Sequence, residues 1–408
     1  MRIKLEFYKT HCLMVREIQI KNFKSIPSLN MELGRFNVLI GANGCGKSNI
    51  LEAITFGAAA LTVKLTNEFL STRGIRVTEP ELMRSAFNLK SQKKAISLHF
   101  SNENKETIAY YIDWENGEWA VSPMIDKDKS TVFNKSEFAS KMRISATGDL
   151  IYGEERVKVG EKMPDNLLEK YNELWSIVKE ESQKYVRYNE LSDFLIFAPE
   201  NYFLRNPFDE NQIKPLGIRG EGLFKHLASV GVKNPSIFKE IKENLSLIEW
   251  FEDLEFEVTA DGYFTGRIKI KDIYLEEGIK YFDPKSANEG FLYLLFYLTL
   301  FISAETPKFF AIDNIDNALN PKLAADLMKI LAQLAEKHNK QVIFTTHNPA
   351  ILDGLNLNDP EQRLFVISRN AVGHTKALRI EKKPAITNGQ SVKLSEQFLR
   401  GYIGGLNF

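Results

Sequence analysis

Apolar runs typical of strands occupy both ends of the chain, and helix-like segments separate them. Residues 14–40 alternate apolar and polar side chains as strands do, and their last run, 36–40, is almost entirely apolar. Near the other end, the apolar runs 308–313 and 341–347 flank the segment 322–338, which has helical periodicity. This order of strand, helix and strand predicts a parallel sheet with crossover connections.

The middle of the chain has a different pattern. Residues 94–100, 107–114 and 118–121 read as antiparallel strands, and an Asn116-Gly117 turn joins the last two. The charged segment 166–188 carries one apolar stripe and predicts a helix. The predicted fold class is therefore α/β, with a mainly parallel sheet, an adjoining antiparallel β-sheet and an inserted α-helical lobe. The remaining predicted elements are helices at 47–70, 223–228 and 235–251 and strands at 194–201, 254–258 and 262–274.

A glycine-rich stretch follows the apolar run at 36–40. It reads Gly41-Ala42-Asn43-Gly44-Cys45-Gly46-Lys47-Ser48 and leads into a helix-like segment. In this P-loop pattern, Gly41 and Gly46 let backbone N–H groups turn inward around a polyphosphate. Lys47 would reach the terminal phosphates, and the Ser48 hydroxyl would coordinate Mg2+. The stretch predicts ATP and Mg2+ as cofactors, bound by Asn43, Gly44, Cys45, Gly46, Lys47, Ser48 and Asn49.

Polar side chains end both apolar runs of the C-terminal half. Asp313 follows four apolar residues, which is the form of a Walker B carboxylate that holds the Mg2+ shell. His347 ends the next run and could sense the γ-phosphate or position the attacking water. The simpler interpretations are an aspartate that caps the region 317–338 and a histidine satisfied within the core. Because ligands of open α/β sheets bind at the carboxyl ends of strands, the neighbouring P-loop favours the catalytic interpretation.

Composition and charge say little about partners. The chain has 408 residues with 53 basic and 53 acidic side chains, so no global field attracts nucleic acid or an anionic membrane. Its two cysteines, Cys12 and Cys45, argue against a disulfide framework and fit a reducing cytoplasm.

The most apolar window, 291–302, is shorter than the ~20 residues a bilayer requires, so it predicts a buried helix and no membrane span. The N-terminus lacks the continuous apolar region of a signal peptide, and Met14 offers a second start beside Met1.

The motifs follow one another in the order found in one group of ATPases. They are Asn22-Phe23-Lys24-Ser25-Ile26, the P-loop, Ile312-Asp313, Leu319-Asn320-Pro321 and Thr346-His347-Asn348-Pro349. The chain thus resembles the ABC-type ATPases of the RecF, SMC and OLD group, within the wider AAA family. The resemblance implies an ABC-type P-loop ATPase core in which Asp313 is the Walker B carboxylate, residues 317–321 form the D-loop and His347 is the switch histidine.

The resemblance also implies an assembly. Residues 286–292 resemble the degenerate signature motif, in which Asn288 and Gly290 would approach the γ-phosphate bound by the opposite subunit. A homo-oligomer with ATP at its subunit interfaces is therefore expected. Asn201 lies near the place of the Q-loop, although no glutamine is present there. The implied domains are an N-terminal core half with the P-loop at 1–70, an antiparallel β subregion with the inserted helical lobe at 71–190, and a C-terminal core half at 191–408.

The chain departs from its group in ways that bear on chemistry. The residue after the Walker B aspartate is usually a glutamate that acts as general base, but here it is Asn314, which cannot accept a proton. Slow ATP hydrolysis is expected, with Asp316 as the nearby carboxylate that could substitute. The catalytic candidates are thus Lys47, Asp313, Asn314, Asp316 and His347.

Two further departures concern domains. The sequence has no long coiled-coil insertion, and little chain follows His347 to form the TOPRIM nuclease of OLD proteins. What remains resembles the stand-alone ATPases that bacterial anti-phage systems such as PARIS and Septu pair with a separate effector.

These observations support one leading hypothesis and two alternatives. In the leading hypothesis, ATP-bound copies assemble, sense DNA or a phage protein, and hold a separate toxic effector, a nuclease. The first alternative is a RecF-like, ATP-gated DNA clamp in repair or replication. Copurification with DNA and no protein partner favours the clamp, whereas a neighbouring nuclease-like reading frame favours defence. A metabolic P-loop kinase is disfavoured, because kinases need an acceptor site and a lid.

Overall fold

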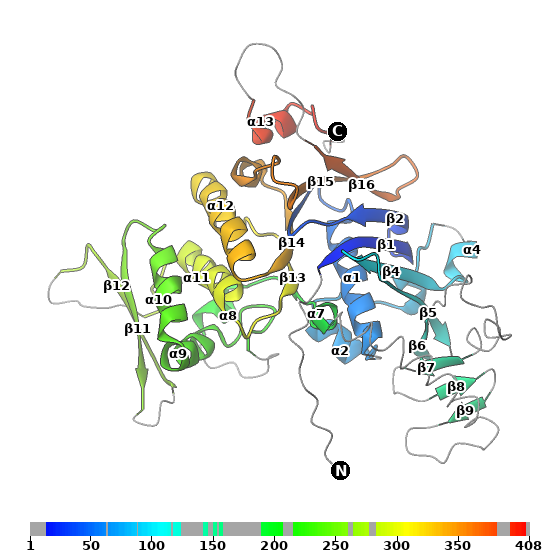
Figure 1. The fold of residues 1–408 in the computed structure, drawn as a ribbon, viewed down its shortest axis with the longest axis horizontal. Coiled ribbons are helices and arrows are strands. Elements are labelled where there is room, and N and C mark those ends of the chain that lie inside the picture. Colours follow the sequence, from blue (N-terminus) through cyan, green and yellow to red (C-terminus); the bar gives the residue numbers. More distant parts are fainter. Residues whose placement is uncertain are drawn as a thin grey trace. The chain divides into compact units, whose positions relative to one another are not determined.

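The protein is described from a computed structural model (Figure 1). The described residues are 14–62, 64–87, 89–115, 117–123, 142–145, 150–152, 155–157, 189–206, 215–259, 264–276, 283–381 and 392–404. The predicted helix at 166–188, the segment before Met14 and Cys12 lie outside these ranges, as does the first residue of the predicted Asn116-Gly117 turn.

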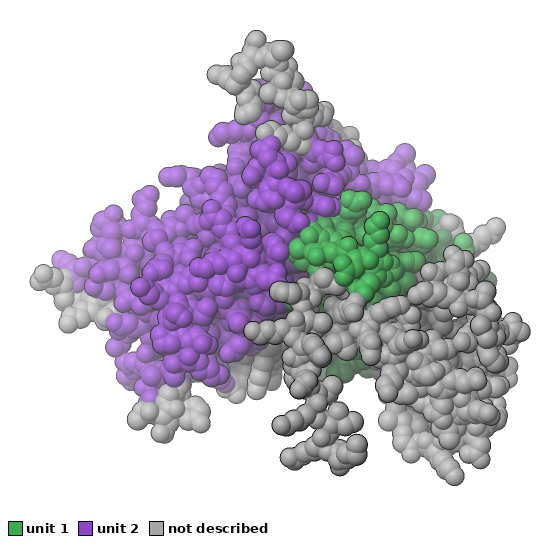
Figure 2. All heavy atoms as spheres, viewed as in Figure 1, with its two compact units in different colours: residues 1–33, 53–71, 76–194 green, residues 34–52, 72–75, 195–408 purple. Residues whose placement is uncertain are grey.

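The chain divides into two compact units, which Figure 2 colours green and purple. The first unit comprises Met1–Leu33, Ala53–Ser71 and Arg76–Phe194. The second comprises Gly34–Glu52, Thr72–Ile75 and Leu195–Phe408. The P-loop, Asp313 and His347 all belong to the second unit, so the candidate site can be described within it. The division into three segments at 70 and 190 stays a prediction.

A six-stranded sheet forms the centre of the second unit, in the order β10-β13-β14-β3-β15-β16. Its strands are β3 (Phe36–Ile40), β10 (Ile196–Phe197), β13 (Phe309–Ile312), β14 (Gln341–Thr346), β15 (Gln362–Arg369) and β16 (Thr375–Ile380). All neighbours are parallel except β16, which runs antiparallel to β15. Every residue of β3, β13 and β14 is buried, as expected for strands with both faces covered. The predicted parallel sheet is confirmed.

Helices and a hairpin complete the second unit. They are α8 (Asn201–Arg205), α9 (Leu223–Lys233), α10 (Pro235–Leu245), β11 (Phe251–Val258), β12 (Phe264–Asp272), α11 (Glu289–Ile302), α12 (Pro321–Lys337), the 3-10 helix η2 (Pro349–Gly354) and α13 (Leu394–Leu399).

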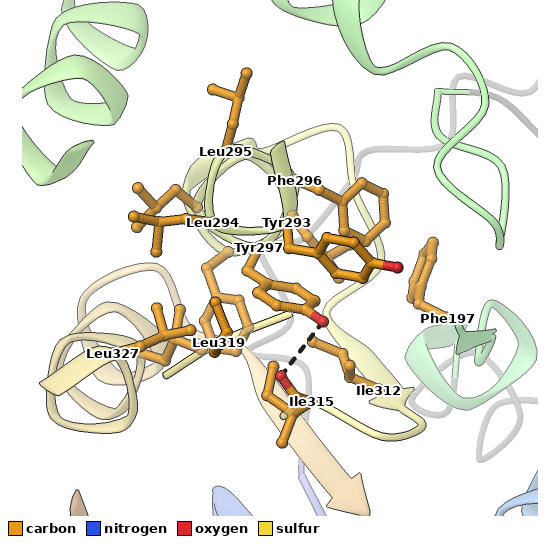
Figure 3. Close-up of a cluster of buried hydrophobic side chains, with 14 of the residues drawn as sticks. Phe197, Tyr293, Leu294, Leu295, Phe296, Tyr297, Ile312, Ile315, Leu319 and Leu327 are labelled. Atoms are coloured by element: carbon orange, nitrogen blue, oxygen red, sulfur yellow. Dashed lines mark hydrogen bonds between the residues drawn. The ribbon is translucent and has the colours of Figure 1, made fainter. Parts of the chain in front are cut away.

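Helix α11 is the centre of the core. All its residues from Gly290 to Ile302 are buried, which confirms the predicted buried helix. Figure 3 shows its side chains among Phe197, Ile312 and Leu327, and the Tyr297 hydroxyl donates to the Ile315 carbonyl at 3.5 Å. Within the described part of the chain, no helix has both the length and the apolarity needed to cross a bilayer.

The first unit is built on an antiparallel sheet of eight strands in the order β2-β1-β4-β5-β6-β7-β8-β9. They are β1 (Val15–Phe23), β2 (Ile26–Glu32), β4 (Ile96–Asn102), β5 (Thr107–Glu115), β6 (Glu118–Pro123), β7 (Met142–Ser145), β8 (Leu150–Tyr152) and β9 (Glu155–Val157). The short helices of this half of the chain are α2 (Asn67–Thr72), α3 (Pro80–Met83), α4 (Leu89–Gln92) and α7 (Asn189–Ser192). The predicted antiparallel β-sheet is therefore confirmed.

Several predicted elements have the wrong length; the helix expected at 223–228, for example, continues to Lys233. The helix expected at 47–70 ends at Leu61, and α2 begins separately after Thr66, whose hydroxyl accepts from the Phe69 N–H at 3.3 Å. A threonine that satisfies a free N–H in this way starts a new helix rather than continuing the old one.

The strand expected at 194–201 contains only Ile196 and Phe197. After it the chain leaves the sheet, because the Ala198 N–H donates to the Ile218 carbonyl at 2.8 Å. The helix expected at 235–251 ends at Leu245, where the Ser246 hydroxyl donates to the Glu243 carbonyl at 2.6 Å. Each boundary is thus set by a polar contact that hydrophobic periodicity does not report.

Candidate nucleotide-binding site

The P-loop joins β3 to α1 (Lys47–Leu61) and has the backbone conformation of an anion cradle. Gly44 and Gly46 have φ angles of 72° and 108°, which side-chain-bearing residues rarely adopt. A Cβ atom at Gly41 would lie 2.1 Å from the Ile367 carbonyl oxygen, so only glycine fits there. The loop then ends at the N-terminus of a 15-residue helix, whose free N–H groups and dipole favour an anion. These features fit a polyphosphate.

Lys47 lies inside this loop, with only 5% of its surface exposed. Its ammonium donates to the carbonyl oxygens of Gly41 at 2.8 Å and Ala42 at 3.1 Å. Burial lowers the pKa of Lys47, although Cys45 and Asp313 nearby oppose the shift. A buried ammonium inside the loop can form strong, charge-assisted hydrogen bonds to an anionic phosphate.

Ser48 and Asp313 lie together at the carboxyl end of β13. The Ser48 hydroxyl is 3.1 Å from Oδ2 of Asp313, and the Thr345 hydroxyl donates to Oδ1 of the same carboxylate. Thr345 also accepts from the Asn314 N–H at 2.9 Å. Mg2+ is usually held by one or two protein oxygens, with waters and substrate phosphates completing its shell. The Ser48 and Asp313 oxygens therefore fit a magnesium site.

His347 follows β14 and lies next to Lys47. Its Nδ1 atom is 3.3 Å from the Lys47 ammonium. Because an ammonium only donates, Nδ1 accepts and the neutral ring carries its proton on Nε2. Burial lowers the pKa of His347, and the charge of Lys47 lowers it further. The lowered pKa favours the neutral form of the ring, although Asp316, Asp313 and a backbone hydrogen bond with Gly41 oppose the shift.

Asp316 is held by the neighbouring threonine of β14. The Thr346 hydroxyl donates to Oδ1 of Asp316 at 2.6 Å and accepts from the Asn348 N–H at 2.9 Å. Thr345 and Thr346 thus fix the Asp313 and Asp316 carboxylates, and sequence reasoning missed both threonines in these roles. These roles could have been suspected from the sequence, because both threonines lie in a fully buried strand and buried hydroxyls need hydrogen-bond partners.

The predicted signature segment lies beside the predicted D-loop. Asn288 caps α11 by accepting from the Gly290 N–H at 2.8 Å. A Cβ atom at Gly290 would lie 3.0 Å from the Ala318 carbonyl oxygen. The close approach at Gly290 is therefore with its own chain, and the approach to a neighbouring subunit stays a prediction.

Asn201 is connected to the segment before α11. Arg205 donates to Oδ1 of Asn201 at 2.6 Å and to the carbonyl oxygens of Pro284 and Lys285 at 3.1 and 2.6 Å. The start of α8 and the segment that leads into α11 are thereby held together.

The fold and the site define a class of protein. A P-loop after β3, a carboxylate after β13 and a histidine after β14, on a parallel sheet accompanied by an antiparallel one, are the parts of an ABC-type ATPase. The chain belongs to the family described as "AAA domain, putative AbiEii toxin, Type IV TA system", whose model matches residues 36–353. It is an ATPase of the AAA and ABC type, and the resemblance to the RecF, SMC and OLD group is confirmed.

Several known proteins are similar to parts of the chain. The "Retron Ec83 probable ATPase" of Escherichia coli is 37% identical over 70 residues, which are 16% of this chain and 13% of that protein. The "OLD nuclease" of Thermus scotoductus is 28% identical over 87 residues, which are 19% of this chain and 16% of that protein. The chain spans about a third or less of the length of the curated relatives it matches; the share is 34% for an uncharacterised protein of Methanocaldococcus jannaschii.

One solved structure supports the fold. The SmcHead bound to the C-winged helix domain of ScpA aligns with a TM-score of 0.52 and 14% identity, covering 90% of this chain and 98% of that chain. At this identity the likeness concerns the fold, and it confirms the predicted ABC-type ATPase architecture.

Proposed function

We propose that the protein binds ATP with Mg2+, hydrolyses it slowly, and uses the ATP-bound state to assemble and to hold a separate toxic effector in anti-phage defence. The observation that carries the proposal is a full set of nucleotide-binding side chains combined with an amide at position 314. The Lys47 ammonium lies 3.3 Å from His347, and the Ser48 hydroxyl lies 3.1 Å from Asp313. Asn314 follows Asp313 without contributing a carboxylate.

Each side chain has a role in binding. Lys47 and the N-terminus of α1 stabilise the phosphates, while Ser48 and Asp313 would hold Mg2+. Bound Mg2+ would neutralise phosphate charge. The exposed His347 lies 3.3 Å from Lys47 and would sense the γ-phosphate or position the attacking water.

Slow hydrolysis follows from Asn314. Its φ angle of 55° and its backbone bond to Thr345 fix the start of the segment after β13, yet its amide cannot take a proton from water. Loss of a general base typically lowers the rate by about 10²- to 10⁴-fold. Asp316 is the alternative base, although one of its oxygens already accepts from Thr346.

The effector and the defence role rest on the family and the relatives. The family description names a toxin–antitoxin system, and the relatives include a retron ATPase and a nuclease. These names support a partner that is toxic when released, and a nuclease is the first candidate. The trigger in this proposal is DNA or a phage protein. A homo-oligomer would arise if the segment at 286–292 meets the ATP of another copy.

Purification from the native host tests this proposal. A stable complex with a second protein, whose release or activation depends on phage infection, is the expected result. The second candidate, a RecF-like DNA clamp, is favoured by the chain's likeness to an SMC head and to the "Chromosome partition protein Smc" of Methanocaldococcus jannaschii, 28% identical over 142 residues. Recovery of DNA with no protein partner would favour the clamp.

A further inference from the structure

The hairpin formed by β15 and β16 follows the part of the chain that matches the family model, which ends at residue 353. Its two strands pair from Arg369 and Thr375 at the loop end to Leu364 and Ile380 at the open end. Strand β15 also pairs with β3, the strand that leads into the P-loop. The hairpin is therefore a direct neighbour of the nucleotide site.

Thr375, the first residue of β16, contacts the P-loop itself. Its hydroxyl donates to the Cys45 carbonyl oxygen at 2.9 Å, across 330 residues of sequence. Its side chain is completely buried, with 0% exposure. A buried hydroxyl with this partner holds the carbonyl in one direction, because no water can replace it.

The held carbonyl also fixes an N–H group. The peptide unit between Cys45 and Gly46 is planar, so its C=O and its N–H point in opposite directions. With the carbonyl bound to Thr375, the Gly46 N–H points away from the hairpin. In a P-loop the backbone N–H groups are the phosphate ligands, so the orientation of this peptide affects phosphate binding.

A second contact fixes the start of the loop. The register pairs Val366 with Ile40, and the next residues, Ile367 and Gly41, lie so close that a Cβ at Gly41 would be 2.1 Å from the Ile367 carbonyl oxygen. The hairpin thus contacts the P-loop at Gly41 and again at Cys45. Between these points lie Ala42, Asn43 and Gly44, which are exposed.

The hairpin turn is itself well fixed. Oδ1 of Asn370 accepts from the N–H groups of Val372 at 3.2 Å and His374 at 2.9 Å, and the Asn370 N–H donates to the His374 carbonyl at 3.0 Å. Gly373 supplies the positive φ of 81° that the turn needs. Thr375 therefore projects from a rigid support.

We infer that Thr375 is a positioning residue of the nucleotide site, which orients the Cys45–Gly46 peptide so that the Gly46 N–H faces the bound polyphosphate. This inference rests on the proposed ATP binding. It predicts that loss of the Thr375 hydroxyl weakens ATP binding while leaving the fold intact, because the loop must then be ordered by the ligand.

The test is isothermal titration calorimetry of the full chain with ATP and Mg2+. Thr375→Val keeps the shape of the side chain and removes the donor, and about tenfold weaker binding is expected. Thr375→Ser restores the donor and should bind like the wild type. If valine disturbs the packing, Thr375→Ala serves in its place, and about tenfold weaker ATP binding is again expected.

Thr299→Val is the matched control. Thr299 is also 0% exposed and donates to a backbone carbonyl, that of Leu295 at 2.7 Å, in the C-terminal half of α11. It should lose thermal stability as Thr375→Val does, yet keep wild-type affinity for ATP. The inference would be overturned if both Thr375→Val and Thr375→Ala bound ATP with wild-type affinity. It would also be overturned if Thr299→Val lost as much affinity for ATP as Thr375→Val. Either result would leave the proposed function untouched. A wild type that does not bind ATP would instead contradict the proposed function on which the inference depends.

Discussion

At the residue scale, Lys47 has the most direct role, because its ammonium lies inside the P-loop on the carbonyls of Gly41 and Ala42. Charge-assisted contacts to phosphate are the strong ones, so Lys47→Ala should weaken ATP binding about a hundredfold or more. Calorimetry with ATP and Mg2+ measures this loss. Lys322→Ala, which removes an exposed lysine from the start of α12, should bind normally. Unchanged affinity in Lys47→Ala would contradict the site.

His226 provides a prediction about pH. It is buried in α9 and its Nε2 atom lies 2.9 Å from the Ser303 hydroxyl. Burial lowers its pKa, with Lys233 and Lys340 adding to the shift and Glu305 opposing it. Below about pH 6.5 the unfolded chain protonates this histidine more readily than the folded chain, so the free energy of unfolding falls as pH falls.

The variant His226→Gln isolates this effect, because glutamine can still bond to Ser303 but does not titrate in this range. Urea unfolding at pH 7.5 and pH 5.5 should show a smaller loss of stability in the variant than in the wild type. An equal loss in both proteins would mean that His226 does not contribute to the pH dependence.

The candidate nucleotide-binding side chains could be proposed individually from the sequence, but the contacts that support them could not. The P-loop glycines, Lys47 and Asp313 stand in local patterns of a few residues. Thr375 and Cys45 are 330 residues apart, and nothing near either residue indicates the other. The hydroxyl contacts of β14 were hidden for a similar reason, since Thr345 and Asp313 are 32 residues apart.

At the scale of elements, α11 connects the core to the proposed subunit interface. Its start carries the predicted signature segment, but Gly290 also packs against Ala318 of the same chain. A bulky residue at Gly290 would therefore disturb the fold as well as an interface. Ser286 is exposed and precedes the helix, so it is the better position for a test.

Ser286→Arg should bind ATP like the wild type and fail to assemble when ATP is added, because a large cation would occupy the interface. Light scattering with and without ATP follows the assembly. Ser28→Arg, on the exposed side of β2, is the control and should assemble. Normal ATP-dependent assembly of Ser286→Arg would remove the signature assignment.

Element types could be predicted more reliably than element ends. Strands β13 and β14 and the 14-residue α11 follow from their continuous apolar runs and the lengths of those runs. The break between α1 and α2 depends on one threonine cap, and the early end of β10 depends on the carbonyls of Ile218 and Arg219, which are distant in the sequence. Such contacts override periodicity locally without changing the fold.

At the scale of the whole molecule, the proposed effector would bind the ATP-loaded assembly. Copurification of the wild type with a second protein should therefore be lost in Lys47→Ala, which does not load nucleotide. Mass spectrometry of the two eluates identifies the partner. A partner retained equally by Lys47→Ala would show that nucleotide does not control the complex.

The central claim is that the protein holds ATP in a long-lived state because Asn314 replaces a general base. Steady-state ATP turnover of the wild type and of Asn314→Glu, measured side by side on protein shown to bind ATP, tests it most directly. Slow turnover by the wild type, accelerated at least about tenfold by Asn314→Glu, is the predicted result. Brisk wild-type turnover that disappears in Asp316→Ala would contradict the claim and assign the base to Asp316.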